Sequence, residues 1–264
     1  MANHTKNHTT PEELDFYSSV RYDNSNKYIV AVVSKNISTE EIRNKDILDY
    51  GCGTGDASFY FEDSMPASVT GIDIGESNIN YANKKKIQGG GKFENLNFIK
   101  ADLNSHNLEL KKYDLIWSDT TISFLKKPLS ELMYEFKMSL RSGGVLYISF
   151  TKDNFSNTAV YCVIKFLRQL CPKKCGLAFY YLALTRYYVY RIFDKSVEIN
   201  HQEIKNKLNY AFVPHIRLIS IKQILQLMKI NGFEICYVRK RVKSDVNSPA
   251  HLEIKAVKKK RNHT

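Results

Sequence analysis

The stretch Ile47-Leu48-Asp49-Tyr50-Gly51-Cys52-Gly53-Thr54-Gly55 decides the fold of this chain. It begins as a short apolar strand and continues into a turn that carries glycine at every second position. Glycine has no Cβ, so such a turn can be tight and lets a ligand approach the backbone closely. In open α/β sheets, ligands bind outside the carboxyl ends of the strands. The stretch therefore predicts a ligand site directly after the strand 46–50.

Strands and helices are predicted to alternate on both sides of this turn. Apolar runs bounded by turn residues indicate the strands, and apolar residues at helical spacing indicate the helices. Such alternation is typical of a doubly wound, mostly parallel sheet with helices on both faces. The predicted strands are 46–50, 67–73, 96–100, 113–118, 145–150, 233–239 and 251–257, and the helices are 56–63, 76–86, 129–140 and 220–231.

Two acidic residues follow the next predicted strands. Asp73 ends the second strand, about 20 residues beyond the glycine turn, where a carboxylate can accept hydrogen bonds from both hydroxyls of a ribose. Asp102 follows the third strand and can accept a hydrogen bond from the amino group of an adenine. The third glycine comes one residue earlier than in the usual nicotinamide-binding turn. The pattern therefore favours another adenosine-containing cofactor.

The segments 48–55, Gly71-Ile72-Asp73-Ile74 and Lys100-Ala101-Asp102-Leu103 resemble the motifs of class I S-adenosylmethionine-dependent methyltransferases. Segments 113–118 and 140–146 are similar to the fourth and fifth strand motifs of that family. The resemblance is closest to the small-molecule branch that includes ubiquinone-type methyltransferases. It implies a Rossmann-like methyltransferase fold, a seven-stranded sheet with an antiparallel last strand, and S-adenosyl-L-methionine as cofactor.

The resemblance also implies roles for individual residues. Gly51, Gly53 and Gly55 would shape the loop under the methionine part of the cofactor, and Asp49 would anchor that loop. Asp73 would hold the ribose and Ile74 would pack on the adenine. Asp102 and Leu103 would contact the amino end and the ring of the adenine. The backbone carbonyl of Ser118 would contact the methionine amino group.

The chain departs from this family after the fourth strand. Many relatives carry a histidine there, whereas this chain reads Asp119-Thr120-Thr121-Ile122-Ser123. A general base is needed only if the acceptor must lose a proton, and methyl transfer itself mainly demands positioning. The catalytic residues are therefore unknown at this stage, with Asp119 and His215 as the candidates. Both can alternatively be structural residues or line the pocket.

A basic aromatic segment interrupts the alternation after the fifth strand. Residues 155–193 contain six Lys or Arg, ten Phe or Tyr and no acidic residue. We expect an inserted helical cap over 154–215 and an N-terminal helical lid over 12–45, within a single methyltransferase domain spanning 1–264. Three interpretations of the insertion remain open: an apolar lid over the acceptor, a surface that contacts an anionic membrane, and a segment that binds RNA.

Composition limits the classes of protein further. Lys and Arg outnumber Asp and Glu by 39 to 27, which gives a net charge of +12 and favours an anionic partner. Five cysteines without a repeating spacing predict neither a disulfide framework nor a metal site. No signal peptide and no apolar run of transmembrane length is evident. We therefore expect a cytoplasmic protein, with contact to a membrane surface as an alternative.

These observations predict an enzyme that transfers a methyl group from S-adenosylmethionine to a small, apolar or lipid-like metabolite. An RNA-modifying methyltransferase that uses the insertion is one alternative, and a cofactor-binding module without catalysis is another. The sequence does not identify the acceptor molecule, the acceptor atom or the oligomeric state.

Overall fold

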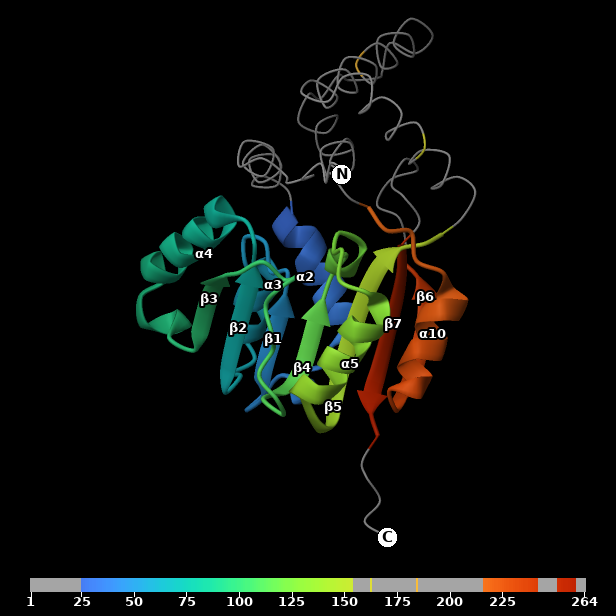
Figure 1. Cartoon of the computed structure of the whole chain (residues 1–264). Coiled ribbons are helices and arrows are strands. Elements are labelled where there is room, and N and C mark those ends of the chain that lie inside the picture. Colours follow the sequence, from blue (N-terminus) through green and yellow to red (C-terminus); the bar gives the residue numbers. More distant parts are fainter. Residues whose placement is uncertain (1–24, 154–161, 163–183, 185–215, 242–250, 260–264) are drawn as a thin grey trace, which may run out of the picture.

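A computed structural model describes residues 25–153, 216–241 and 251–259, together with Cys162 and Leu184. These residues form one seven-stranded sheet with the strand order β3-β2-β1-β4-β5-β7-β6 (Figure 1). The strands are β1 (Asp46–Tyr50), β2 (Ser68–Asp73), β3 (Leu96–Lys100), β4 (Tyr113–Ser118), β5 (Leu140–Thr151), β6 (Phe233–Lys240) and β7 (His251–Lys258).

The sheet is parallel except at one end. The pairs β1–β2, β1–β4, β2–β3 and β4–β5 are parallel, whereas β7 runs antiparallel to both β5 and β6. The chain first moves outward through β2 and β3 and then returns to the other side of β1 to form β4. The strand order therefore reverses between β1 and β4, and open α/β sheets bind their ligands outside the strand ends at such a point. The predicted seven-stranded, mostly parallel fold is confirmed.

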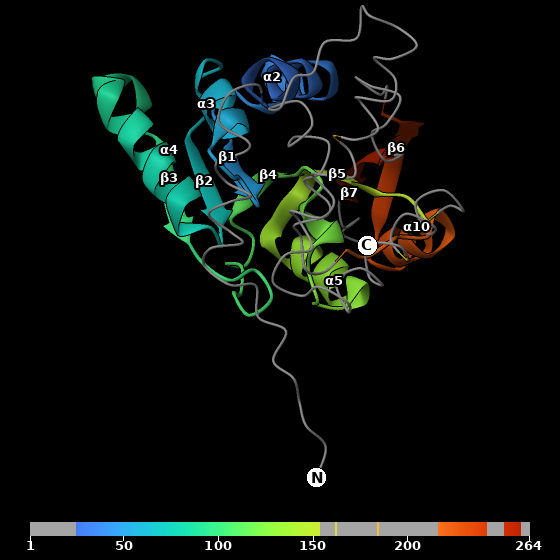
Figure 2. The same ribbon diagram turned by 90° about the horizontal axis from the view of Figure 1, so that it is seen from above.

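Helices cover both faces of the sheet, as the view from above shows (Figure 2). The helices α2 (Ser25–Asn36), α3 (Asp56–Glu62) and α4 (Glu76–Gln88) lie on one face, and α5 (Leu129–Ser139) and α10 (Ile221–Ile230) lie on the other. Within the described residues, three short 3-10 helices occur in the connections: η1 (Thr39–Glu41), η2 (Gly90–Phe93) and η3 (Thr121–Ser123).

The side chains of β1 show how one strand serves both faces. Ile47 is fully buried in the cluster that contains α2, α3 and α4 residues. Leu48 and Tyr50 are fully buried in the opposite cluster, with residues of α5 and α10. This alternation follows from the two-residue period of a strand. It also directs Asp49 toward the face that α2 and α3 cover.

One predicted boundary is wrong. We expected the helix over 129–140 to be stopped by Ser142-Gly143-Gly144 and the fifth strand to begin at Val145. Helix α5 instead ends at Ser139, and β5 begins at Leu140, which pairs with Tyr113. The register then shifts before Leu115 pairs with Val145, and Gly143 has φ +79°. The glycines thus accommodate an irregularity inside the strand, which a helix-stop pattern does not reveal.

The two predicted helical attachments are described to different extents. Helix α2 and the 3-10 helix η1 fall within the predicted lid over 12–45. Apart from Cys162 and Leu184, the predicted cap over 154–215 lies outside the described residues. The lid and cap roles, and the single-domain boundary of 1–264, stay predictions.

Candidate functional site: the edge outside β1, β2 and β4

The glycine turn adopts a conformation that favours glycine at all three positions. Gly51, Gly53 and Gly55 have φ values of +81°, +54° and +81°, in the left-handed region that is costly for residues with a Cβ. The amides of Gly51 and Cys52 both donate to the carbonyl of Ile72, at 2.8 and 3.0 Å. The turn is therefore fastened to the end of the neighbouring strand β2.

The side chain of Asp73 connects this turn to the next loop. Its Oδ2 accepts a hydrogen bond from the Gly53 amide at 2.9 Å, and its Oδ1 accepts one from the Gly75 amide at 2.8 Å. The Asn78 side chain donates to the same Oδ1 at 3.2 Å. An ionised carboxylate has about four acceptor positions, so Oδ2 keeps capacity for a ribose hydroxyl. Ile74, the next residue, is 43% exposed and offers an apolar surface beside this carboxylate.

The two residues after β3 differ in exposure. Asp102 is exposed, and its Oδ1 accepts hydrogen bonds from the backbone amide and the side-chain amide of Asn104, both at 2.9 Å. Leu103 is only 4% exposed and packs in the core cluster, and its carbonyl accepts a hydrogen bond from the Tyr50 hydroxyl. The Leu103 side chain is therefore largely occupied by the core, which leaves it little surface for an adenine ring.

Asp49 is a buried carboxyl group at the end of β1. It is 2% exposed, and the Ser58 hydroxyl of α3 donates to its Oδ2 at 2.7 Å. Burial raises the pKa of Asp49 to about 7. The Ser58 hydrogen bond opposes this shift, and the negative charges of Asp119 and Asp73 reinforce it. A nearby positive charge would favour its ionised form. Ser118, at the end of the adjacent strand β4, is fully buried as well.

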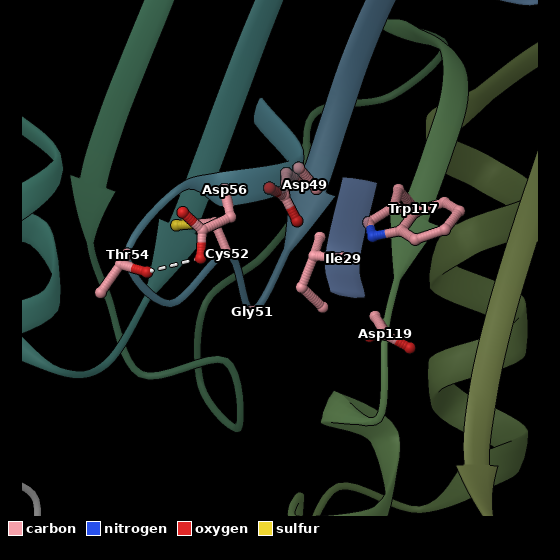
Figure 3. Close-up of a pocket in the computed structure, with 9 residues that line it drawn as sticks. Ile29, Asp49, Gly51, Cys52, Thr54, Asp56, Trp117 and Asp119 are labelled. Carbon is pink, nitrogen blue, oxygen red and sulfur yellow. Dashed lines mark hydrogen bonds between the residues drawn. The ribbon is translucent and has the colours of Figure 1, made fainter. Parts of the chain in front are cut away.

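A hollow of about 360 Å³, counted out to its open mouth, lies against these residues. Figure 3 shows that its walls come from β1, the glycine turn, β4 and α2, with the carboxylates of Asp49 and Asp119 on it. The sequence did not single out every residue of this lining. The residues missed were Ile29, Cys52, Thr54, Asp56, Ala57 and Trp117. Cys52, Thr54 and Asp56 lie within or beside the glycine motif, a local signal that could have identified them.

Asp119 is engaged in an ion pair and is therefore poorly suited to the role of general base. Its Oδ1 accepts hydrogen bonds from the Ser149 hydroxyl at 2.5 Å and from the guanidinium of Arg241. Arg241 also donates to the Tyr147 hydroxyl and to Glu253, at 2.9 and 2.8 Å. A carboxylate held by a buried guanidinium is stabilised in its ionised form and takes up a proton less readily. The other candidate, His215, lies outside the described residues.

The described part of the chain also bears on metals and membranes. Within it, no three His, Cys, Asp or Glu side chains come together in an arrangement that could hold a metal ion. None of the helices described is both long enough and apolar enough to cross a membrane.

Fold and site together define a class of protein, an α/β enzyme with an adenosine-type cofactor site. A family model described as "Methyltransferase domain" matches residues 42–211, more than half of the chain. The chain belongs to this family and is an S-adenosylmethionine-dependent methyltransferase. The left-handed glycine turn, the acid after β2 and the exposed Ile74 fit that cofactor.

Individual relatives support the family and the fold. Malonyl-[acyl-carrier protein] O-methyltransferase of Acetivibrio thermocellus is 26% identical, over 71% of this chain and 74% of that protein. Fatty-acid O-methyltransferase of Mycolicibacterium smegmatis is 24% identical, over 46% of this chain and 43% of that protein. The structure of magnesium protoporphyrin IX methyltransferase from Synechocystis PCC 6803 is 15% identical with a TM-score of 0.60, and the match covers 94% of both chains. This last likeness concerns the fold alone.

Proposed function

We propose that this enzyme methylates the carboxylate of a small, apolar or lipid-like acid. One observation carries the proposal: Asp119, the candidate base that lies within the described residues, is held by Arg241 and Ser149. A carboxylic acid acceptor needs no base because it is already ionised at neutral pH. An alcohol or phenol acceptor would have to lose a proton. Two relatives are named for methylating malonyl-[acyl-carrier protein] and fatty acids, and these names support an acid acceptor.

The cofactor would be held by the residues at the ends of β1, β2, β3 and β4. In this proposal Gly51, Gly53 and Gly55 give the backbone a close approach to its methionine part, and Asp73 holds the ribose. Ile74 covers one face of the adenine, while Asp102 accepts from its amino group. The remaining contacts are assigned to Asp49 and to the backbones of Leu103 and Ser118.

The acids at this site suit a positively charged cofactor. S-adenosylmethionine supplies an electrophilic methyl group on a positively charged sulfur. Asp49 lines the hollow beside the glycine turn, and the positive charge of the cofactor would favour its ionised form. As the acceptor carboxylate gains the methyl group, the carbon–sulfur bond breaks and its electron pair stays on sulfur. The product is a neutral methyl ester, and no proton has to move.

The acceptor can be identified with methyl-labelled cofactor. We expect label to enter octanoate, decanoate or a malonyl thioester, and brief alkaline treatment to release it as methanol, because esters hydrolyse in base. Methyl ethers and methylamines survive this treatment. Label that is stable to base, or transferred equally well to octanol, would contradict a carboxylate acceptor.

A matched pair of acid substitutions tests the cofactor site in the same assay. Asp73→Asn removes the charge that holds the glycine turn and, in this proposal, the ribose. We expect the Kd of S-adenosylmethionine to rise about 10- to 100-fold, the loss expected for hydrogen bonds to a charged group. Asp63→Asn changes an exposed acid at the end of α3, paired with Lys92 at 2.9 Å, and should leave the Kd unchanged. Calorimetry on both variants distinguishes these outcomes.

A further inference from the structure

Arg217 lies beside the carboxyl ends of β4 and β5. Its backbone amide donates to the carbonyl of Ser123 in η3 at 2.6 Å. Two residues later, Ile219 forms a parallel bridge with Lys152, and its amide donates to Thr151 O at 3.1 Å. The segment that begins at Ile216 therefore continues along the end of β5. This position places Arg217 at the edge of the sheet where the ligands of such folds bind.

The guanidinium of Arg217 is only partly satisfied. Its Nη2 donates to the carbonyl of Lys127 at 2.8 Å, while its Nη1 is buried and has no hydrogen-bond partner among the described residues. Burial lowers the pKa of Arg217, and no described acid compensates for it. Arg141, Arg239 and Arg241, in contrast, each contact at least one carboxylate.

Arg217 is half-buried, and a positive charge that is partly removed from water is costly unless it is paired. Arg217 therefore has an unfilled requirement for an anion. A guanidinium presents its N–H groups in a planar fork that matches the two oxygens of a carboxylate. Nη1 would supply one arm of such a contact.

The 3-10 helix η3 connects Arg217 to the cofactor loop. At its first residue, the Thr121 side chain occupies the space in which a Cβ of Gly51 would lie, at 2.7 Å from Thr121 Cβ. At its last residue, Ser123 accepts the hydrogen bond from Arg217. Apart from the Ser118 backbone at the end of β4, the residues assigned to the cofactor gather outside β1, β2 and β3, so the end of β5 remains for the acceptor. Arg217 is thus one turn of 3-10 helix away from the glycine turn, on the acceptor side.

We propose that Arg217 binds the carboxylate of the acceptor acid. This inference rests on the proposed function, since it assumes an acid acceptor. Arg217 holds the carboxylate through N–H donors, and each oxygen keeps a lone pair for the incoming methyl group. The charge of the guanidinium would also distinguish acids from neutral molecules of the same shape.

The test compares octanoate with octanamide, its uncharged analogue, by calorimetry on the enzyme loaded with S-adenosylhomocysteine. We expect the wild type to bind octanoate about 10- to 100-fold more tightly than octanamide, and Arg217→Gln to lose this preference. Arg217→Lys keeps the charge without the fork and should recover part of it. Arg43→Gln removes one exposed arginine elsewhere and should behave as the wild type. In turnover assays, Arg217→Gln should raise KM for octanoate far more than it lowers kcat.

Two results would overturn the role of Arg217: a wild type that does not prefer octanoate to octanamide, and an Arg217→Gln variant that retains the preference. The Kd of S-adenosylhomocysteine and the melting temperature show whether each variant is folded. If Arg217→Gln does not fold, Arg217→Lys is compared with the wild type instead. Failure of the proposed function looks different, because the methyl label is then absent from base-labile esters whatever residue stands at 217.

Discussion

The sheet has two halves, one formed by β1, β2 and β3 and the other by β4, β5, β7 and β6. Both halves hold acidic side chains, but different groups bind these acids in each half. In the first half, Asp73 accepts from backbone amides 20 and 2 residues away in the sequence. In the second half, Asp119 and Glu253 contact the guanidinium of Arg241, which is 122 residues from Asp119. Local backbone amides thus hold the acid at the end of β2, in the half that we propose binds the cofactor (the cofactor half), and a long-range ion pair holds the acid after β4, in the half that we propose binds the acceptor (the acceptor half).

The largest expected effect concerns the ion pairs of the acceptor half. Arg241→Met leaves Asp119 and Glu253 without their shared cation, although both are nearly buried. We expect the free energy of unfolding to fall by about 3 to 5 kcal/mol, measured by denaturant titration. Lys92→Met breaks an exposed ion pair, with side chains 61% and 59% exposed, and should cost at most about 1 kcal/mol. Equal losses in the two variants would remove the distinction between the halves.

A smaller effect is expected for the backbone of the cofactor half. Gly51→Ala places a Cβ against Thr121 at a residue with φ +81°. We expect about 2 to 4 kcal/mol of destabilisation from the left-handed conformation and the overlap together, with a large loss of cofactor affinity. Gly90 has φ +58° and open space within 4 Å, so Gly90→Ala should cost only about 1 to 2 kcal/mol. Thermal or denaturant unfolding of both variants separates overlap from strain, and a similar loss in both would show that Thr121 yields.

The smallest expected effect lies at Asp49, on β1 beside the boundary between the two halves. Its pKa in the folded protein is raised to about 7, so the folded state binds more protons than the unfolded state up to that pH. The stability of the wild type relative to Asp49→Asn should therefore fall by about 1.4 kcal/mol between pH 6 and pH 8 and stay constant above. Asparagine keeps an acceptor for Ser58 and does not titrate. A difference that stays flat from pH 6 to pH 8 would show that Asp49 is already ionised.

The sequence was informative where the determinants are local. The predicted strand ranges around the glycine turn agree with β1, β2, β3 and β4 to within a residue, because apolar runs and turn residues mark them directly. Asp73 lies where its distance from the turn predicts. The start of β5 was misplaced because its pairing with Tyr113 depends on a neighbouring strand.

The parts that could not be predicted depend on contacts between distant residues. Nothing near Asp119 in the sequence indicates Arg241, and nothing near Leu103 shows that Tyr50 fixes its carbonyl. Arg217 carries no motif, and its buried, unsatisfied Nη1 is evident only in the folded structure. When a site is built from single side chains on separate elements, the sequence shows no periodicity or fixed spacing that would reveal it.

Helix α2, which gives the hollow its Ile29 wall, is fastened to the strands at the other end of the chain. Tyr237 and Arg239 of β6 donate to Asn36 Oδ1, and Lys255 of β7 donates to the Asn36 carbonyl at 2.9 Å. These partners are separated by 201 to 219 residues. During synthesis on a ribosome, the helix therefore cannot make these contacts until the last strands have emerged. A nascent chain that already has its glycine turn would still lack the fastening of this wall, so the two sides of the hollow are completed at different times.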